Sequence, residues 1–409
     1  MFASNANPRN KNVPSDLTTD VLVIGAGPAG SMVAKWAARE GAKVLMIEKR
    51  QEIGSPVRCG EGMSKDWLKE VGIEPSPRWI NVEVEGARIF SPNETVFEIN
   101  EKHAGNEVGY VVERDAFDKA LAIDAANAGS EVMLKTAAVG ILKEGNRVVG
   151  ARVKQFGEQF DIHARVTVGA DGFESQVGRW AGLPTNLQIR DMDTCLQYRM
   201  TNVDSDVRYC DFYLGKVAPG GYVWIFPKGE GLANVGIGVQ VSKIKSMAEA
   251  KAHLDRWIEH HPAYAKGKKI DVVGGGVSIA PPLKQTVTDG FMLVGDAARM
   301  IDPLTGGGIA NGCIAGKICG EVAAQAVVAD DPSKEFLQRY EKGWRGRLEE
   351  KLYRNWLAKE KLCTLSDETF DKIVDALKDV KLEKLNVHNI LKAVHDKYPD
   401  VTKEFEAFL

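Results

Sequence analysis

The glycines of GAGPAG, residues 25–30, have the spacing of a loop that binds the pyrophosphate of a dinucleotide. In this spacing Gly25 permits a tight turn, Gly27 lets the backbone approach the phosphates, and Gly30 allows the next helix to pack closely on the strand. A short apolar run, residues 20–24, precedes the glycines, and an Ala-rich stretch of helical character follows them. The first N–H groups of such a helix, and its dipole, would face the phosphates.

A carboxylate follows at the distance that this kind of site requires. Residues 43–47 form a second apolar run, which ends at Glu48, 23 residues after Gly25. An acidic side chain at this point accepts a hydrogen bond from a ribose hydroxyl in dinucleotide-binding folds. The glycines alone would also fit a simple glycine-rich turn. The strand, helix, second strand and terminal acid together predict a dinucleotide site.

The loop QEIGSPVRCGEG, residues 51–62, is rich in turn formers and too long to be a simple connection. Loops of this kind beside a cofactor strand are usually functional. Arg58 could contact a phosphate, and Cys59 stands next to glycines that permit close backbone approach. Cys59 is either a small buried residue or a side chain that approaches the cofactor, and the local sequence leaves both interpretations open.

A second set of glycines indicates a second helix N-terminus that favours an anion. The apolar run 291–294 ends at Gly295 and Asp296, and the glycines at 306–308 then open a long Ala- and Gly-rich helix. Two such termini suit one large cofactor that has a pyrophosphate and a separate electron-rich ring. NAD alone would not need the second terminus.

The composition is that of an ordinary globular protein with room for two or three domains. The chain has 409 residues, of which 44% are hydrophobic and 27% charged, and a formal net charge of −3. This charge argues against general attraction to nucleic acid. The polar start predicts a disordered leader, and the six cysteines lack a metal-binding or disulfide spacing. The cysteine spacing leads us to expect reduced thiols, a cytoplasmic setting and no metal. The sequence also lacks an uncharged apolar run long enough to span a bilayer.

The order of the patterns predicts an α/β fold, with a Rossmann-like cofactor-binding domain, an inserted antiparallel β-sheet domain for the substrate, and a C-terminal helical layer. Apolar runs alternating with helical stretches indicate the first part. Short strands separated by Gly and Pro indicate the second, and charged amphipathic stretches indicate the third. The expected boundaries are 1–19 for the leader, 20–80, 109–190 and 285–330 for the cofactor-binding domain, 81–108 and 191–284 for the β-rich domain, and 331–409 for the helical layer.

Tyr222, Trp224 and Phe226 alternate along one expected strand and therefore lie on one side of it. An aromatic stripe of this kind is usually part of a core, but it could equally line an apolar surface that binds a substrate. The helical stretch after residue 330 also has two interpretations. It is either an outer layer packed on the body or the border of a lipid entrance.

Four motifs stand in order along the chain: the glycines at 25–30 with Glu48, then Arg114, then Asp171-Gly172, then Gly295-Asp296 with the glycines at 306–308. This order resembles the FAD-binding family of aromatic hydroxylases, such as para-hydroxybenzoate hydroxylase. It resembles more closely the geranylgeranyl reductases, and among them the archaeal digeranylgeranylglycerophospholipid reductases. The stretches that carry the resemblance, from residue 20 toward the C-terminus, are EKRQEIGSPVRCGEGMS, GNEVGYVVERDAFDKAL, GADGFESQVGRWAG, GYVWIFPKGEGLANVGIG, VGDAARMIDPLTGGGIANG and YRNWLAKEKL.

The resemblance implies FAD as the cofactor and places Cys59 near the flavin ring, as a proton donor or as a wall of the site. It also implies substrate contacts at Tyr222, Trp224, Phe226 and Lys351. Spacing and resemblance together predict cofactor contacts at Gly25, Gly27, Ala29, Gly30, Glu48, Arg58, Cys59, Gly60, Gly62, Arg114, Ala138, Asp296, Gly306, Gly307, Gly308 and Ile309.

The reductases that this sequence resembles saturate isolated C=C bonds in the prenyl chains of archaeal membrane lipids. Reduced flavin delivers hydride to one alkene carbon, and a proton reaches the other. Hydroxylases of this superfamily commonly have His after Gly-Asp-Ala-Ala, where this sequence has Arg299, so hydroxylation is disfavoured. An aromatic monooxygenase and a non-catalytic lipid-binding flavoprotein are the alternatives. The resemblance further implies a prenylated glycerophospholipid substrate, peripheral membrane contact, and an electron donor that is ferredoxin, a deazaflavin or a nicotinamide.

Overall fold

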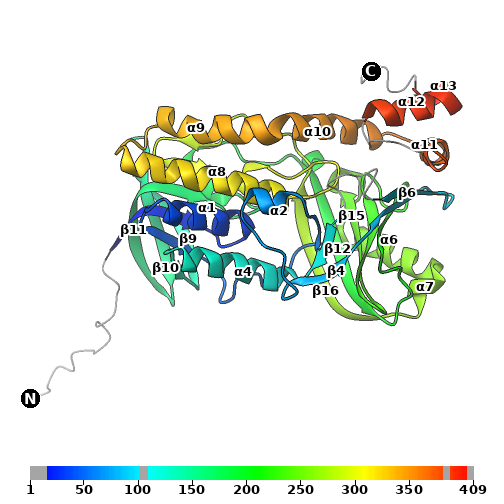
Figure 1. Ribbon diagram of the computed structural model, residues 1–409, viewed down its shortest axis with the longest axis horizontal. Helices are drawn as coiled ribbons and strands as arrows, with labels where there is room; N and C mark the ends of the chain where they lie inside the picture. Colours follow the sequence, from blue (N-terminus) through cyan, green and yellow to red (C-terminus); the bar gives the residue numbers. More distant parts are fainter. Residues whose placement is uncertain (1–15, 101–108, 381–386, 403–409) are drawn as a thin grey trace, which may run out of the picture.

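The computed structural model describes residues 16–100, 109–380 and 387–402 (Figure 1). The expected leader therefore lies mostly outside the described residues. Its last part is ordered, because strand β1 begins at Leu17 rather than at Asp20 and pairs with β11 from its first residue. Residues 17–19, which were expected to belong to the leader, instead add three pairs to the sheet ladder: Leu17 with Ile162, Thr18 with His163 and Thr19 with Ala164.

The first sheet has eight strands and the parallel centre that a dinucleotide-binding domain requires. Its order is β17-β18-β11-β1-β2-β8, with β10 and β9 continuing from β11. The pairs around β1 are parallel, and the central strands are apolar on both faces, as expected for strands covered by helices. The strands are β1 (Leu17–Ile24), β2 (Val44–Ile47), β8 (Glu131–Met133), β9 (Thr136–Glu144), β10 (Arg147–Gln155), β11 (Glu158–Gly169), β17 (Val287–Thr288) and β18 (Phe291–Leu293).

Helices α1 (Pro28–Arg39), α4 (Arg114–Asn127) and α8 (Ile309–Val328) lie beside one another along this sheet (Figure 1). Helix α8 packs tightly on α1, because Gly320 of α8 leaves no room for a side chain. A Cβ there would lie 2.5 Å from the carbonyl oxygen of Val33. Short helices α2 (Trp67–Glu70) and α5 (Gln176–Ala181) complete this domain.

The second sheet has seven strands in the order β16-β12-β15-β14-β13-β5-β6, antiparallel except between β13 and β5. One face packs on helix α6 (Met247–His260), where Val223 and Ile225 join its core. The alternate residues of β14, Tyr222, Trp224 and Phe226, therefore lie on the opposite face. The strands are β5 (Gly86–Phe90), β6 (Val96–Asn100), β12 (Met192–Thr201), β13 (Tyr209–Tyr213), β14 (Tyr222–Gly229), β15 (Leu232–Gln240) and β16 (Lys268–Ser278). The short helix α7 (Pro262–Ala265) follows α6 and precedes β16.

A three-stranded sheet, β3 (Gly62–Ser64), β7 (Gly109–Val112) and β4 (Ile80–Glu83), connects the two larger sheets. Its strand β7 leads directly into α4, and its strand β3 continues the loop 51–62. This small sheet therefore sets the position of the Cys59 loop relative to both domains.

The C-terminal helices form a layer over the first domain and continue to the β6 edge of the second sheet (Figure 1). Helix α9 (Lys334–Trp344), a π-turn at Arg345–Glu349 and α10 (Glu350–Leu362) form one continuous rod. Leu337, Tyr340 and Trp344 of this rod belong to the core of the first domain. The smaller helices that follow are α11 (Asp367–Leu377), α12 (Val387–Lys397) and α13 (Pro399–Thr402). The fold class expected from the sequence is thus confirmed.

Candidate active site

The glycine loop 25–30 lies between β1 and α1 with the geometry that its spacing predicts. Gly25 has a φ of 111°, in the left-handed region that favours glycine, and a Cβ on it would lie 2.3 Å from the carbonyl oxygen of Ala170. A Cβ on Gly30 would lie 1.9 Å from the carbonyl oxygen of Gly25. In contrast, a Cβ on Gly27 would meet no atom within 4 Å. The backbone at Gly27 therefore borders open space at the N-terminus of α1.

The N-terminus of α8 lies beside that of α1. A Cβ on Gly312, in the first turn of α8, would lie 3.4 Å from the Cβ of Ala29. Neither helix has a side chain that caps its N-terminus, since the N-cap residues are Gly27 and Gly308. The Asp296 carboxylate lies at the start of α8, 2.8 Å from where a Cβ on Gly308 would be. Two uncapped helix N-termini, each favourable to negative charge, thus lie close together.

Glu48 joins the end of β2 to the glycine loop. Its Oε2 accepts a hydrogen bond from the N–H of Ala26 at 3.1 Å, and its Oε1 accepts one from the N–H of Arg50 at 3.0 Å. The carbonyl oxygen of Glu48 accepts a hydrogen bond from the N–H of Thr136 at 2.8 Å, at the start of β9. This bond brings Ala138, two residues further along β9, to the same end of the sheet. The two expected cofactor contacts Glu48 and Ala138 are therefore near each other.

Both expected phosphate-binding arginines have carboxylate partners in this structure. Arg114 is the first residue of α4, and its Nε donates to Asp118 Oδ1 at 2.9 Å. Arg58 is exposed, with Nη1 3.8 Å from Glu174 Oε1. Contact between either guanidinium and a pyrophosphate remains a prediction.

The loop 58–62 lies directly against the aromatic side of β14. A Cβ on Gly60, or one on Gly62, would lie 2.9 Å from Cε2 of Phe226, so both positions must lack a side chain for this contact. A Cβ on Gly60 would also lie 3.4 Å from Nε1 of Trp224. The loop that carries the half-buried Cys59 therefore lies against the aromatic face of β14, which the sequence offered as a possible substrate surface.

Side-chain amides of the second sheet hold this loop along its backbone. Gln197 donates from Nε2 to the carbonyl oxygen of Cys59 at 3.1 Å and accepts from Nε1 of Trp224 at 2.8 Å. Asn234 donates from Nδ2 to the carbonyl oxygen of Gly60 at 3.1 Å. One residue, Gln197, therefore fixes both the Cys59 loop and the Trp224 ring.

Glu61 is the centre of a buried charge cluster that the sequence did not predict. Its side chain is fully buried, and its Oε2 accepts hydrogen bonds from Arg199 at 2.7 Å, Lys228 at 3.0 Å and Asn234 at 2.7 Å. Glu113 contacts the same two cations, at 3.0 Å from Arg199 and 3.0 Å from Lys228. Lys228, like Glu61, has a side chain with no exposed surface. Two carboxylates and two cations thus meet at the contact between the domains.

Only two residues of this cluster, Glu61 and Lys228, stand in a sequence pattern that could have marked them. Glu61 is the one charged residue between glycines in RCGEG, and Lys228 continues the alternation of the aromatic stripe by one more step. Arg199 and Asn234 lie on β12 and β15 in stretches with no local pattern that marks them. Only the pairing of β12 with β15, and of β15 with β14, brings them to Glu61.

The electrostatic surroundings of Cys59 are cationic on one side. Burial lowers the pKa of the Arg114 guanidinium, but the Asp118 carboxylate and the nearby Cys59 sulfur outweigh this and raise that pKa well above its ordinary value. The Cys59 Sγ also accepts a hydrogen bond from the N–H of Glu61 at 3.2 Å. The Arg114 guanidinium and the N–H of Glu61 therefore both lie beside the Cys59 sulfur.

A carboxyl group lies on the same side of β12 as Gln197. Asp193 Oδ1 is buried and has no hydrogen-bond partner among the described residues. Burial raises the pKa of Asp193 to about 7, although Lys359 and Lys243 lower it. This side of the sheet therefore carries a group that exchanges a proton near neutral pH.

The aromatic side of β14 is also tied to the loop that precedes α8. The Tyr222 hydroxyl donates to the carbonyl oxygen of Thr305, and Asn355 of α10 donates to Asp302 Oδ2 at 2.7 Å. Gly306 and Gly307 are exposed between these anchors, and Ile309 begins α8.

In α10, Lys351 is exposed beside the buried Leu352. A substrate contact of Lys351 therefore remains a prediction.

Two features of this site fit a large flavin nucleotide. The open space at Gly27 and the uncapped starts of α1 and α8 suit a pyrophosphate and an electron-rich ring edge. Asp171 Oδ1, after β11, is buried without a hydrogen-bond partner among the described residues. Such an atom can accept a hydrogen bond from water or from a bound group.

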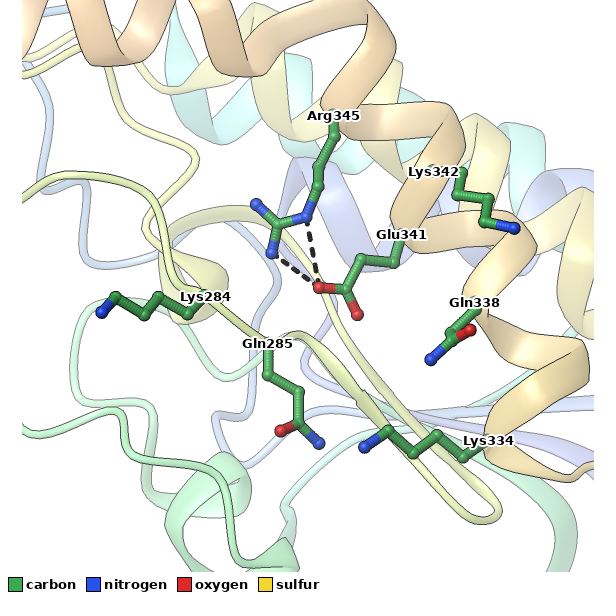
Figure 2. Close-up of a pocket in the computed structure, with 7 residues that line it drawn as sticks. All are labelled: Lys284, Gln285, Lys334, Gln338, Glu341, Lys342 and Arg345. Carbon is green, nitrogen blue, oxygen red and sulfur yellow. Dashed lines mark hydrogen bonds and ion pairs between the residues drawn. The ribbon is translucent and has the colours of Figure 1, made fainter.

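A separate surface pocket lies away from these residues. It has a volume of about 330 Å³ and lies between α9 and the segment before β17 (Figure 2). In Figure 2, Arg345 and Glu341 pair on its α9 side, at 2.6 Å. The pocket contains no residue predicted to contact cofactor or substrate. Its lining residues are Lys284, Gln285, Lys334, Gln338, Glu341, Lys342 and Arg345.

The comparisons with known proteins agree with this architecture. The family described as pyridine nucleotide-disulphide oxidoreductase matches residues 19–210, and the geranylgeranyl reductase catalytic domain matches residues 191–277. A flavin-dependent brominase is 19% identical, covers 95% of this chain and 98% of its own, and superposes with a TM-score of 0.70, which shows the shared fold. The two family matches define an oxidoreductase with a geranylgeranyl reductase catalytic domain.

Full-length relatives define the family. Digeranylgeranylglycerophospholipid reductase of Picrophilus torridus is 52% identical over 96% of this chain and 100% of its own. The Methanosarcina acetivorans protein of the same name is 47% identical over 92% of each chain. A geranylgeranyl bacteriochlorophyll reductase-like protein of Thermoplasma acidophilum is 51% identical and has a TM-score of 0.92 over 97% of this chain and 100% of its own. This chain belongs to the digeranylgeranylglycerophospholipid reductase family.

Proposed function

We propose that this protein saturates C=C bonds in the geranylgeranyl chains of archaeal ether glycerophospholipids, with FAD as its cofactor. The observation that carries the proposal is the contact between the Cys59 loop and the aromatic side of β14, where a Cβ on Gly60 would lie 2.9 Å from the Phe226 ring. This contact joins the cofactor-binding and substrate-binding surfaces in a chain that is 52% identical to a reductase of this kind over 96% of its length.

In this proposal the first domain holds the cofactor through its backbone. Gly27 and the N–H groups of α1 bind the pyrophosphate, and Glu48 accepts a hydrogen bond from a ribose hydroxyl. The start of α8, behind Gly306 and Gly307, stabilises negative charge at the edge of the ring. FAD, when bound and reduced, supplies the hydride that the alkene carbon receives.

The side chains of the second sheet orient the prenyl chain and exclude water from it. An isolated alkene has no polar group, so its position depends on apolar contact with Tyr222, Trp224 and Phe226. Saturation also needs one proton for each double bond. Cys59 holds a proton at Sγ on the loop that faces these rings, and it is the proposed donor to the second alkene carbon.

Anaerobic reduction followed by mass spectrometry tests this function. The purified flavoprotein is reduced with dithionite and mixed with a geranylgeranylated glycerophospholipid. We expect a stepwise gain of hydrogen pairs in the lipid together with reoxidation of the flavin. A lipid of unchanged mass, with flavin that remains reduced until oxygen enters, would contradict the proposal. Hydroxylation of an aromatic compound on addition of NADPH and oxygen would then identify the monooxygenase alternative.

The electron donor and the membrane contact are further parts of the proposal. The donor is a ferredoxin, a deazaflavin or a nicotinamide, and stopped-flow reduction of the bound flavin by each donor in turn distinguishes them. None of the helices described is both long and apolar enough to cross a membrane. Because the substrate resides in a bilayer, we propose peripheral contact, which flotation with lipid vesicles measures.

A further inference from the structure

Glu61 has a backbone conformation that its residue type does not favour. Its φ is 76°, in the left-handed region, while the glycines on both sides of it would adopt that region without strain. A residue held in such a conformation persists only where its surroundings determine it strongly. The side chain at this position is therefore expected to make contacts that a third glycine could not make.

Every hydrogen-bonding group of Glu61 has a partner. Its N–H donates to Cys59 Sγ at 3.2 Å, and its carbonyl oxygen accepts from the N–H of Val112 at 2.9 Å. Its Oε1 accepts from the N–H of Arg114 at 2.9 Å. Its Oε2 takes the three donors of the second sheet described above, the closest at 2.7 Å. One residue thus connects the thiol, the start of α4 and the strands of the second sheet.

The contacts of Glu61 determine the distance between the Cys59 thiol and the aromatic rings of β14. The Cys59 side chain of this loop lies beside the Arg114 guanidinium, while Gly60 and Gly62 touch the Phe226 ring. The anchors of Glu61 come from β12, β14 and β15, the strands that also present Gln197 and the aromatic side chains. A shift of the Glu61 carboxylate would therefore move the thiol relative to the rings.

We propose that Glu61 is a positioning residue, whose buried carboxylate holds the loop 58–62, and with it the Cys59 thiol, in register with the aromatic side of β14. This inference deepens the proposed function and rests on it. Hydride and proton reach an isolated alkene only in a narrow range of geometries, since the alkene offers no polar group to guide it. The charge cluster around Glu61 provides this geometry by fixing the position of the Cys59 thiol relative to the aromatic side chains of β14.

Substitution of Glu61 by Gln tests the inference with little change of shape. The amide has an oxygen on one side and N–H donors on the other, so it cannot accept from both Arg114 and the cations Arg199 and Lys228. We expect its oxygen to face the cations and the contact with the Arg114 N–H to be lost. The matched control is Asp211→Asn, which removes a buried carboxylate on β13 of the second sheet that pairs with Arg88 at 2.7 Å and does not contact the loop.

Hydrogen–deuterium exchange gives a readout that does not depend on turnover. In the chain without added cofactor and in the loaded chain, Glu61→Gln should lower the protection of loop 58–62, Val112 and Arg114, and leave α1 unchanged. Asp211→Asn should leave these amides protected. Equal loss of protection throughout the protein, or the same pattern in both variants, would overturn the inference.

The second readout separates kcat from KM for lipid saturation. Loss of geometry should lower kcat by about tenfold to a hundredfold and change KM little, because apolar contact with the substrate is retained. Adding Lys228→Met to Glu61→Gln removes one of the two cations that would otherwise share the single remaining carboxylate, Glu113. We expect this double variant to regain stability but not kcat. Recovery of kcat together with stability would assign Glu61 to charge balance alone and overturn the inference.

Asn234→Ala covers the case in which Glu61→Gln does not fold. It removes one donor each from Gly60 and Glu61 and leaves the ion pairs in place. Exchange in loop 58–62 should rise, and unchanged exchange would contradict the inference. Failure of the proposed function looks different. The wild-type protein would then leave the lipid unsaturated, while the local exchange pattern of Glu61→Gln would still appear.

Discussion

The glycine loop 25–30 and the charge cluster around Glu61 are built in opposite ways. The loop 25–30 works through its backbone, and its critical glycines contact atoms such as the carbonyl oxygens of Ala170 and Gly25. The cluster around Glu61 works through side chains from four strands or loops, with partners 138 to 173 residues away. The first region is specified by missing side chains and the second by buried charge.

This difference predicts different consequences of substitution. A backbone site fails when a side chain takes up space, and the cost depends on which atom that side chain would meet. A charge cluster fails when one partner leaves, because the remaining charge is buried without compensation. Variants of the two regions should therefore separate loss of fold, loss of cofactor and loss of rate.

Gly30→Ala should have the largest effect. Its Cβ would lie 1.9 Å from a backbone oxygen, so α1 or the glycine loop must move. We expect a loss of about 4 kcal/mol or more in the free energy of unfolding, measured by urea denaturation. The matched control is Gly27→Ala, whose Cβ would meet nothing within 4 Å. That variant should keep its stability and lose FAD affinity. Equal stability of the two variants would contradict the contrast between them.

Lys228→Met should have the second-largest effect and lower the free energy of unfolding by about 3–5 kcal/mol. The substitution leaves the fully buried Glu61 and its neighbour Glu113 with one cation, Arg199, between them. Urea denaturation measures the cost, and the double variant with Glu61→Gln should lose clearly less than the sum of the two single variants. Simple additivity would show that the residues do not act as a cluster.

Cys59→Ala should slow alkene reduction by roughly a hundredfold, the effect expected when a proton donor is removed. The half-buried side chain is small, so the variant should fold and retain FAD. Single-turnover reoxidation of the reduced flavin by the lipid measures the rate, with Cys363→Ala as the control for removing a half-buried thiol elsewhere. An unchanged rate would remove Cys59 from the mechanism.

Asp193→Asn should have the smallest effect and should depend on pH. The folded pKa of about 7 lies above the ordinary value of 3.8, so the folded state binds more protons between these two pH values. Stability from this group is therefore present at low pH and is lost as pH rises toward 7. At pH 8 the variant should be more stable than the wild type by about 1–3 kcal/mol, because no buried charge forms. At pH 4 this advantage should disappear, and thermal unfolding at both pH values measures it.

Several elements could be predicted because their determinants are local. The turn at Gly25, the helix that follows it and the alternation of Tyr222, Trp224 and Phe226 depend on neighbours within one strand or one helical turn. The structure confirms these elements and the α/β fold class. The expected start of the first strand at residue 20 was less accurate. The strand begins at Leu17, because residues 17–19 pair with β11, a strand far along the chain.

The sequence by itself determined the dinucleotide-binding half, because glycine spacing and apolar runs act through backbone geometry that neighbouring residues control. The tertiary structure alone decided that the aromatic stripe faces the Cys59 loop and that Glu61, Arg199, Lys228 and Asn234 meet there. The pairing of β12, β15 and β14, and the packing of loop 58–62 on them from more than a hundred residues away, bring these side chains together. A buried charge is stable only with its partner, and the partner's position follows from the fold rather than from its sequence neighbours.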